Sequence, residues 1–191
     1  MDGEALARLN LTRRALLARM GAGTVALGVA TAEGRVSPAR ARAQGAALAH
    51  FGDDEASTLG ALGEVLLPGA EEAGIVHFVD DQLGRESPLL LLRYIDGVDD
   101  HEGFYRGGLA ALNTLSEERH GQRFDRCTAE QRTALVGEIA GTVPEGWHGP
   151  PAPLFYYVLR NDAVDVVYGT PEGYAKLNVP YMAHIMPPPG W

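Results

Sequence analysis

Apolar residues recur at helical spacing through most of the chain after residue 50. Leucines and alanines at every third or fourth position predict a helix that starts at Asp53 or Asp54, and Pro68-Gly69 ends it. Thr128-Ala129-Glu130-Gln131 is a capping-box pattern, because the Thr128 hydroxyl and the Gln131 amide can satisfy reciprocal backbone groups at a helix start. Alternation typical of strands is scarce. We therefore predict helices over residues 53–67, 75–83, 88–95, 100–119, 129–139 and 154–168.

Residues 169–191 break this pattern. Prolines there are expected to forbid a helix and to favour an extended, polyproline-like path, yet Tyr, Met and Trp stay frequent. These residue types are common at interfaces, and an extended apolar segment cannot form its own core. We expect this tail to lie on a partner, with packing over its own helices as the alternative. The interface candidates are Phe155, Tyr156, Tyr168, Tyr174, Tyr181, Met182, His184, Ile185 and Trp191.

Length and composition support one folded unit. The 191 residues, 46% of them hydrophobic, are enough to bury a core. The predicted fold is all-α: a single small helical domain with an extended C-terminal tail rich in proline and aromatic residues. The formal net charge of -9, without a basic stripe in the body, excludes nucleic acid as an expected partner.

The first 43 residues differ from the rest in charge. They contain seven arginines against three acidic residues, whereas the remainder has nine basic and 22 acidic residues. The uncharged run Met20–Ala32 follows the first arginines, and its 13 residues are too few for a bilayer-spanning helix of about 20. A basic stretch, an apolar run and then small residues form the layout of a secretory signal.

Paired arginines make this signal more specific. Thr12, Arg13, Arg14, Leu16 and Leu17 lie in a segment that resembles the twin-arginine export motif. Ala41 and Ala43 fit a small-x-small cleavage site, and Ala30-Thr31-Ala32 fits one as well. We expect residues 1–43 to be a cleaved or flexible twin-arginine signal, and residues 44–191 to be the helical domain. Because twin-arginine export carries folded proteins, usually with a cofactor, the cofactor belongs to this chain or to a companion.

Residues typical of an active site are sparse. The single cysteine, Cys127, excludes an intramolecular disulfide, four-thiolate iron–sulfur ligation and haem attachment through a C-x-x-C-H motif. Asp99-Asp100-His101-Glu102 is the densest set of metal-ligand residue types, but only Asp99 and Glu102 would share a helix face. Acids at this position also suit a helix N-terminus, which we favour. We predict no catalytic, cofactor or metal site in this chain; the alternative is an independent exported metal-binding protein or enzyme that uses the Asp99–Glu102 cluster.

Two parts of the chain resemble a known family. They are Gly74-Ile75-Val76-His77-Phe78-Val79-Asp80, and the segment from Asp162 to Tyr174 with Pro180-Tyr181-Met182-Ala183-His184-Ile185. Together with the leader and the helical body they look like the gluconate 2-dehydrogenase subunit 3 family. The resemblance spans most of the chain and is most specific in the C-terminal third.

This resemblance implies an accessory role. Members are small subunits of membrane-associated sugar and polyol dehydrogenases, in which a large subunit of the glucose–methanol–choline type binds FAD and does the chemistry. A multihaem cytochrome c, with haem c, is commonly a third subunit. The small subunit is expected to act as a chaperone for the flavoprotein and to escort it through the twin-arginine translocase to the periplasm, beside the inner membrane. Substrate determinants would then lie in the large subunit.

Overall fold

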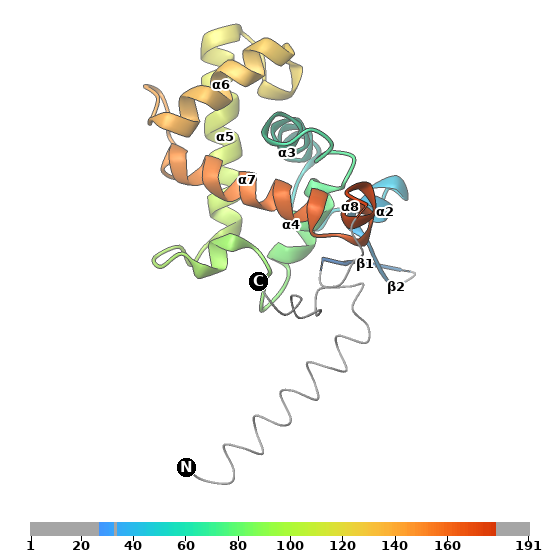
Figure 1. Cartoon of the computed structure of the whole chain (residues 1–191). Coiled ribbons are helices and arrows are strands. Elements are labelled where there is room, and N and C mark those ends of the chain that lie inside the picture. Colours follow the sequence, from blue (N-terminus) through green and yellow to red (C-terminus); the bar gives the residue numbers. More distant parts are fainter. Residues whose placement is uncertain (1–26, 33, 179–191) are drawn as a thin grey trace, which may run out of the picture.

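Five of the predicted helices form the body of the computed structural model, which describes residues 27–32 and 34–178 (Figure 1). Two 3-10 turns, η1 (Leu91–Tyr94) and η2 (Phe124–Arg126), connect them. The helices are α3 (Asp53–Leu66), α4 (Ile75–Leu83), α5 (His101–His120), α6 (Ala129–Gly141) and α7 (Ala152–Tyr168). In the described part of the chain the only sheet is one two-stranded ribbon, so the prediction of a small all-α domain is confirmed.

The ends of these helices follow from their capping residues. The Thr128 hydroxyl accepts the Gln131 N–H at 3.3 Å while the Gln131 side chain accepts the Thr128 N–H at 2.9 Å, which confirms the capping box. Asp100 caps α5, because its carboxylate accepts the Gly103 N–H at 2.8 Å. Helix α5 ends at Gly121, which has the left-handed φ of 70° typical of a helix C-terminus.

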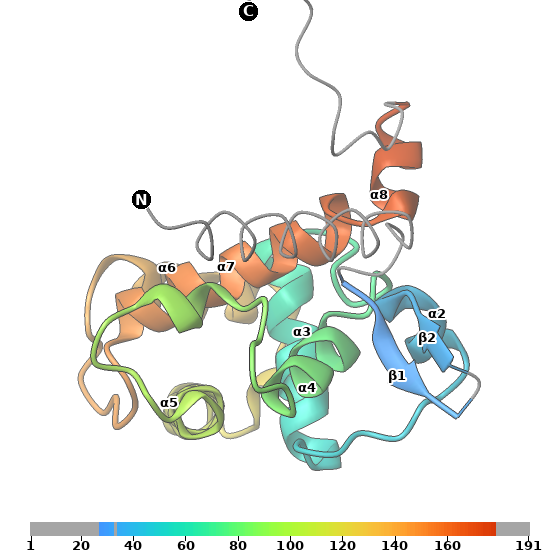
Figure 2. The ribbon, with the colours of Figure 1, turned by 90° about the horizontal axis from the view of Figure 1, so that it is seen from below.

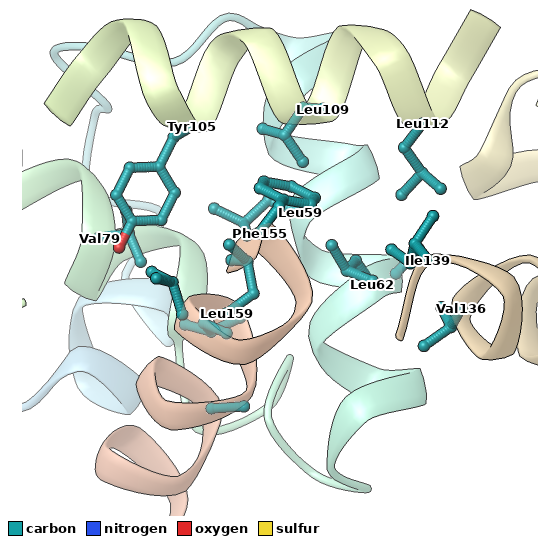
Figure 3. Packing of buried hydrophobic residues seen from close by; sticks show 14 of the residues in the cluster. Leu59, Leu62, Val79, Tyr105, Leu109, Leu112, Val136, Ile139, Phe155 and Leu159 are labelled. Carbon is teal, nitrogen blue, oxygen red and sulfur yellow. The ribbon is translucent and has the colours of Figure 1, made fainter. Parts of the chain in front are cut away.

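The core lies where α3, α4, α5, α6 and α7 meet, and Figure 3 shows it from close by. Burying each large apolar side chain there contributes roughly 1.5–3 kcal/mol. Helix α5 comes close to α7 at Gly108, since a Cβ atom at this position would overlap the Phe155 ring. The labelled core residues are Leu59, Leu62, Val79, Tyr105, Leu109, Leu112, Val136, Ile139, Phe155 and Leu159.

Two segments differ from the expected elements. The helix predicted over residues 88–95 is only the four-residue turn η1, because apolar residues run continuously there instead of at helical spacing. Residues 171–176 form a short helix, α8 (Pro171–Lys176), so the prediction of an extended path was wrong for them. The Thr170 hydroxyl accepts the Gly173 N–H at 3.1 Å, and Pro171 sits in the first turn, where a helix tolerates proline.

Residues 29–43 of the predicted leader form three small elements. Strands β1 (Val29–Thr31) and β2 (Gly34–Val36) pair antiparallel, with Val29 opposite Val36, and α2 (Pro38–Ala43) follows. Figures 1 and 2 place this hairpin and α2 beside α4, on the side away from α5. Within the residues that the structure describes, no helix combines the length and apolarity needed to cross a membrane.

Candidate partner-binding surface

Helix α7 carries apolar side chains on two faces. Its inner face is completely buried and includes Phe155 and Leu159. On the opposite face Tyr157, Val164 and Tyr168 are 52%, 41% and 39% exposed. Their spacing of seven and four residues places them on one side of the helix. We call these three residues the α7 stripe.

One polar neighbour of the α7 stripe turns its side chain to the helix backbone. Asn161, between Tyr157 and Val164, donates its amide to the Tyr157 carbonyl at 2.7 Å. Its polar group is therefore bonded to the helix backbone. Exposed apolar groups that line up on one helix face, with tyrosine among them, are typical of protein-binding surfaces.

The C-terminal end of α7 leads directly into a second exposed apolar group. Helix α8 packs on α7, and its Gly173 lies against the Val167 carbonyl, where a Cβ atom would overlap. Leu177, just beyond α8, is 53% exposed. The described part of the chain thus ends just after α8, which packs on the helix that bears the α7 stripe.

The structure places the predicted interface residues in different environments. Phe155 is a core residue: its ring is fully buried, with the Phe104 and Trp147 rings each 6.0 Å away between centroids. Tyr156 is half-buried against the core and Tyr168 is exposed. Tyr174, on α8, is half-buried. The remaining candidates lie outside the described residues: Tyr181, Met182, His184, Ile185 and Trp191.

Sequence reasoning missed Tyr157 and Val164. The signal was present, because α7 has more large apolar residues than one buried helix face can hold. The export-motif residues Thr12, Arg13, Arg14, Leu16 and Leu17 lie outside the described residues. Of the two cleavage-site alanines, Ala41 is fully buried in α2 and Ala43 is exposed at its end.

The acidic cluster at the start of α5 is engaged in structural contacts. Asp100 is the helix cap. Glu102 contacts His50 Nδ1 at 3.0 Å through one carboxylate oxygen and Arg106 Nε at 3.4 Å through the other. Across residues 27–32 and 34–178, no three His, Cys, Asp or Glu side chains converge as a metal site would require.

One buried polar pair joins α5 to α7. The Tyr105 hydroxyl donates to Asp162 Oδ2 at 2.5 Å, and both side chains are fully buried. Asp162 Oδ1 has no hydrogen-bond partner. Burial raises the pKa of Asp162 to about 7, although the Tyr105 hydrogen bond lowers it. Because no reactant in solution reaches these groups, we assign the pair a structural role.

One histidine and one cysteine side chain also make structural contacts. His77 Nε2 lies 3.1 Å from the Ala46 carbonyl, and burial lowers the pKa of His77. Cys127 is buried, with its Sγ atom 3.0 Å from the Ser116 hydroxyl. Neither contact supplies a nucleophile with an adjacent base, which covalent catalysis requires.

Comparisons with known proteins identify the family. The model of the gluconate 2-dehydrogenase subunit 3 family matches residues 53–187. This range starts at the first residue of α3 and includes all of α7 and α8. No curated protein and no solved structure matches the chain. Since the family match covers well over half of its length, the chain belongs to the gluconate 2-dehydrogenase subunit 3 family.

Proposed function

We propose that this chain is the non-catalytic small subunit of a FAD-dependent sugar or polyol dehydrogenase of the glucose–methanol–choline type. The observation that carries the proposal is the α7 stripe, which lies within the family match and leaves three large apolar side chains exposed on one face. An accessory subunit needs such a surface, because burial of apolar area is the main driving force for association.

The polar groups of the described chain support the same role. Within the Asp99–Glu102 cluster, Asp100 caps α5 and Glu102 contacts His50, and Tyr105 and Asp162 are buried in the core. In the complex that we propose, FAD is held by the flavoprotein catalytic subunit, and electrons pass to a multihaem cytochrome c. This chain would supply a binding surface and no redox group.

We further propose that the chain acts as chaperone and export escort. The twin-arginine motif at Arg13-Arg14 supports this role, because that pathway carries folded complexes. One signal on the small subunit would then serve both subunits. The complex would reach the periplasm and associate with the inner membrane through its other subunits.

Co-expression of this chain with the product of the neighbouring gene tests the proposal. A tag on this chain should recover a large subunit with the visible spectrum of a flavin. The double variant Tyr157→Ser/Val164→Ser should lower the recovered flavin at least tenfold, because it removes most of the apolar area of the α7 stripe.

The control is Val143→Ser. Val143 has the same side chain as Val164, is 60% exposed and lies outside the α7 stripe. This variant should leave recovery unchanged. A colourless single chain, with all flavoprotein activity exported in its absence, would contradict the proposal. Metal bound in stoichiometric amount to the purified chain would favour the alternative Asp99–Glu102 site instead.

A further inference from the structure

Two adjacent carboxylates on α4 bind residues that precede the family match. Asp80, 4% exposed, accepts three backbone N–H groups. Those of Ala49 and His50 lie at 2.8 Å and that of Phe51 at 2.9 Å. A carboxylate that accepts several N–H groups forms strong, charge-assisted hydrogen bonds. The chain that enters α3 is thereby fixed to α4.

Asp81 binds the hairpin farther back along the chain. Its Oδ1 accepts the Ala30 N–H at 2.8 Å, and its Oδ2 accepts Arg85 Nε at 2.7 Å. Arg35 of β2 lies 3.9 Å from the same carboxylate. Arg35 and Arg85 both donate to the Gly28 carbonyl. Carboxylate and guanidinium groups of the body thus hold both strands.

Close packing adds to these polar contacts. Ala41 of α2 is fully buried, and α2 packs on α4. Gly74, with a φ of 86°, makes room for this approach, because a Cβ atom there would overlap the Pro38 carbonyl. Only glycine combines that left-handed conformation with so close a backbone contact.

Both small-x-small sequences lie inside this docked segment. In Ala30-Thr31-Ala32 the first two residues are paired in β1, the Ala30 N–H is held by Asp81, and Ala32 follows the strand and is exposed. In Ala41-Arg42-Ala43 it is helical and partly buried. A protease needs the residues that precede the cut bond as accessible backbone free of other hydrogen bonds, and in both sequences these residues are held in a strand or a helix of the folded protein.

We infer that α4 is a docking site for the described residues 28–32 and 34–51 and that the mature protein keeps residues 27–43, uncut at Ala32 and at Ala43. The segment is then a permanent part of the subunit, and any processing takes place before Leu27. The inference concerns this segment alone and does not depend on the partner.

Intact mass of the full chain, purified after expression with an active export pathway, tests the inference. A mass that includes residues 27–43 is expected, and an N-terminus at Glu33 or Gln44 would overturn it. The same measurement on the Arg13→Lys/Arg14→Lys variant separates export from processing. If neither the unaltered chain nor this variant is exported, the export proposal fails. Docking of the segment is still tested, by limited proteolysis.

Limited trypsin digestion of the purified full chain measures the docking directly. Cleavage after Arg35, Arg40 and Arg42 should be at least tenfold faster in Asp81→Ala than in the unaltered chain. Asp96→Ala, an exposed acid in the loop after η1, is the matched control and should change nothing. If Asp81→Ala does not fold, Arg35→Ala removes a hairpin contact without altering α4, and cleavage is then compared at Arg40 and Arg42 only. Equal cleavage rates in all folded proteins would overturn the inference.

Discussion

Three carboxylates of this protein show how their local partners decide what a buried acid does. Asp80 accepts three backbone N–H groups, and Asp81 accepts one backbone N–H and contacts two arginines, so each carboxylate acts as a hydrogen-bond acceptor. Asp162 has one hydroxyl donor and one oxygen without a partner. An anion in that place is costly, and protonation relieves the cost.

Asp162 makes the stability of the protein depend on pH. Its pKa is about 7 in the folded chain, against about 4 for an unfolded aspartate. At a pH between these two pKa values Asp162 is protonated in the folded state and ionised in the unfolded state. The stability of the folded state therefore declines as the pH rises through this range. We expect the free energy of unfolding to fall by up to about 1.4 kcal/mol per pH unit from pH 4 to 7 and then to level off.

Denaturant unfolding of Asp162→Asn at several pH values checks this expectation. The variant should lose most of the decline, because its amide does not titrate and still accepts the Tyr105 hydroxyl. Tyr105→Phe should extend the decline to higher pH, since the Tyr105 hydrogen bond lowers the pKa of Asp162 in the folded chain. Parallel curves for Asp162→Asn and the unaltered chain would contradict this account.

At the scale of single elements, close approach between helices depends on glycine at particular positions. Gly107 and Gly108 are neighbours on α5, but only Gly108 faces α7 at short range. A Cβ atom at Gly108 would overlap the Phe155 ring, whereas one at Gly107 would meet Pro150 Cδ at an ordinary 3.6 Å. The two positions therefore form a matched pair within one helix.

We expect opposite effects from alanine at these positions. Gly108→Ala should destabilise the protein by about 1–3 kcal/mol, because the added methyl group forces α5 and α7 apart. Gly107→Ala should stabilise it by roughly 0.5–1 kcal/mol, because alanine loses less conformational entropy in a helix. Chemical denaturation with far-UV circular dichroism measures both changes. Equal effects would show that the helices do not pack as described.

The sequence predicts the longer elements well because their signals are local. Caps and apolar spacing place α3, α4, α5 and α7 within a few residues of their observed bounds. The three-residue strands, α2 and α8 are too short for a periodic signal, and contacts with distant residues stabilise them. The roles of Asp80 and Asp81 were equally hidden, because their partners are backbone groups about 30 to 50 residues away. The α7 stripe was predictable from α7 itself, but only Tyr168 was selected.

At the scale of the whole molecule, α7 connects most of the fold. It packs against α3, α4, α5, α6, α8 and η1, and the α7 stripe lies on its outer side. A partner bound to the stripe holds α7 and thereby every element that packs on it. Binding and folding stability are linked, since a partner that binds only the folded state stabilises it.

Thermal unfolding should therefore report partner binding. At a flavoprotein concentration about 100 times the dissociation constant, the linkage adds roughly 2.7 kcal/mol and raises the Tm of this chain by about 5–10 °C. The Tyr157→Ser/Val164→Ser variant should keep its own Tm and lose this increase, whereas Val143→Ser should show it in full. An increase that persists in the double variant would place the contact elsewhere.

The way Asp80 binds its neighbours also bears on how freely the preceding chain can vary. Asp80 contacts the N–H groups of Ala49 and His50, which every residue except proline possesses. The contact therefore places no demand on which side chains occupy these two positions. Docking of this kind can survive extensive divergence in sequence. A family model detects side chains that recur among relatives, so it has little to detect in the segment before Asp53. The fold of the subunit thus begins well before Asp53, where its recognisable sequence begins.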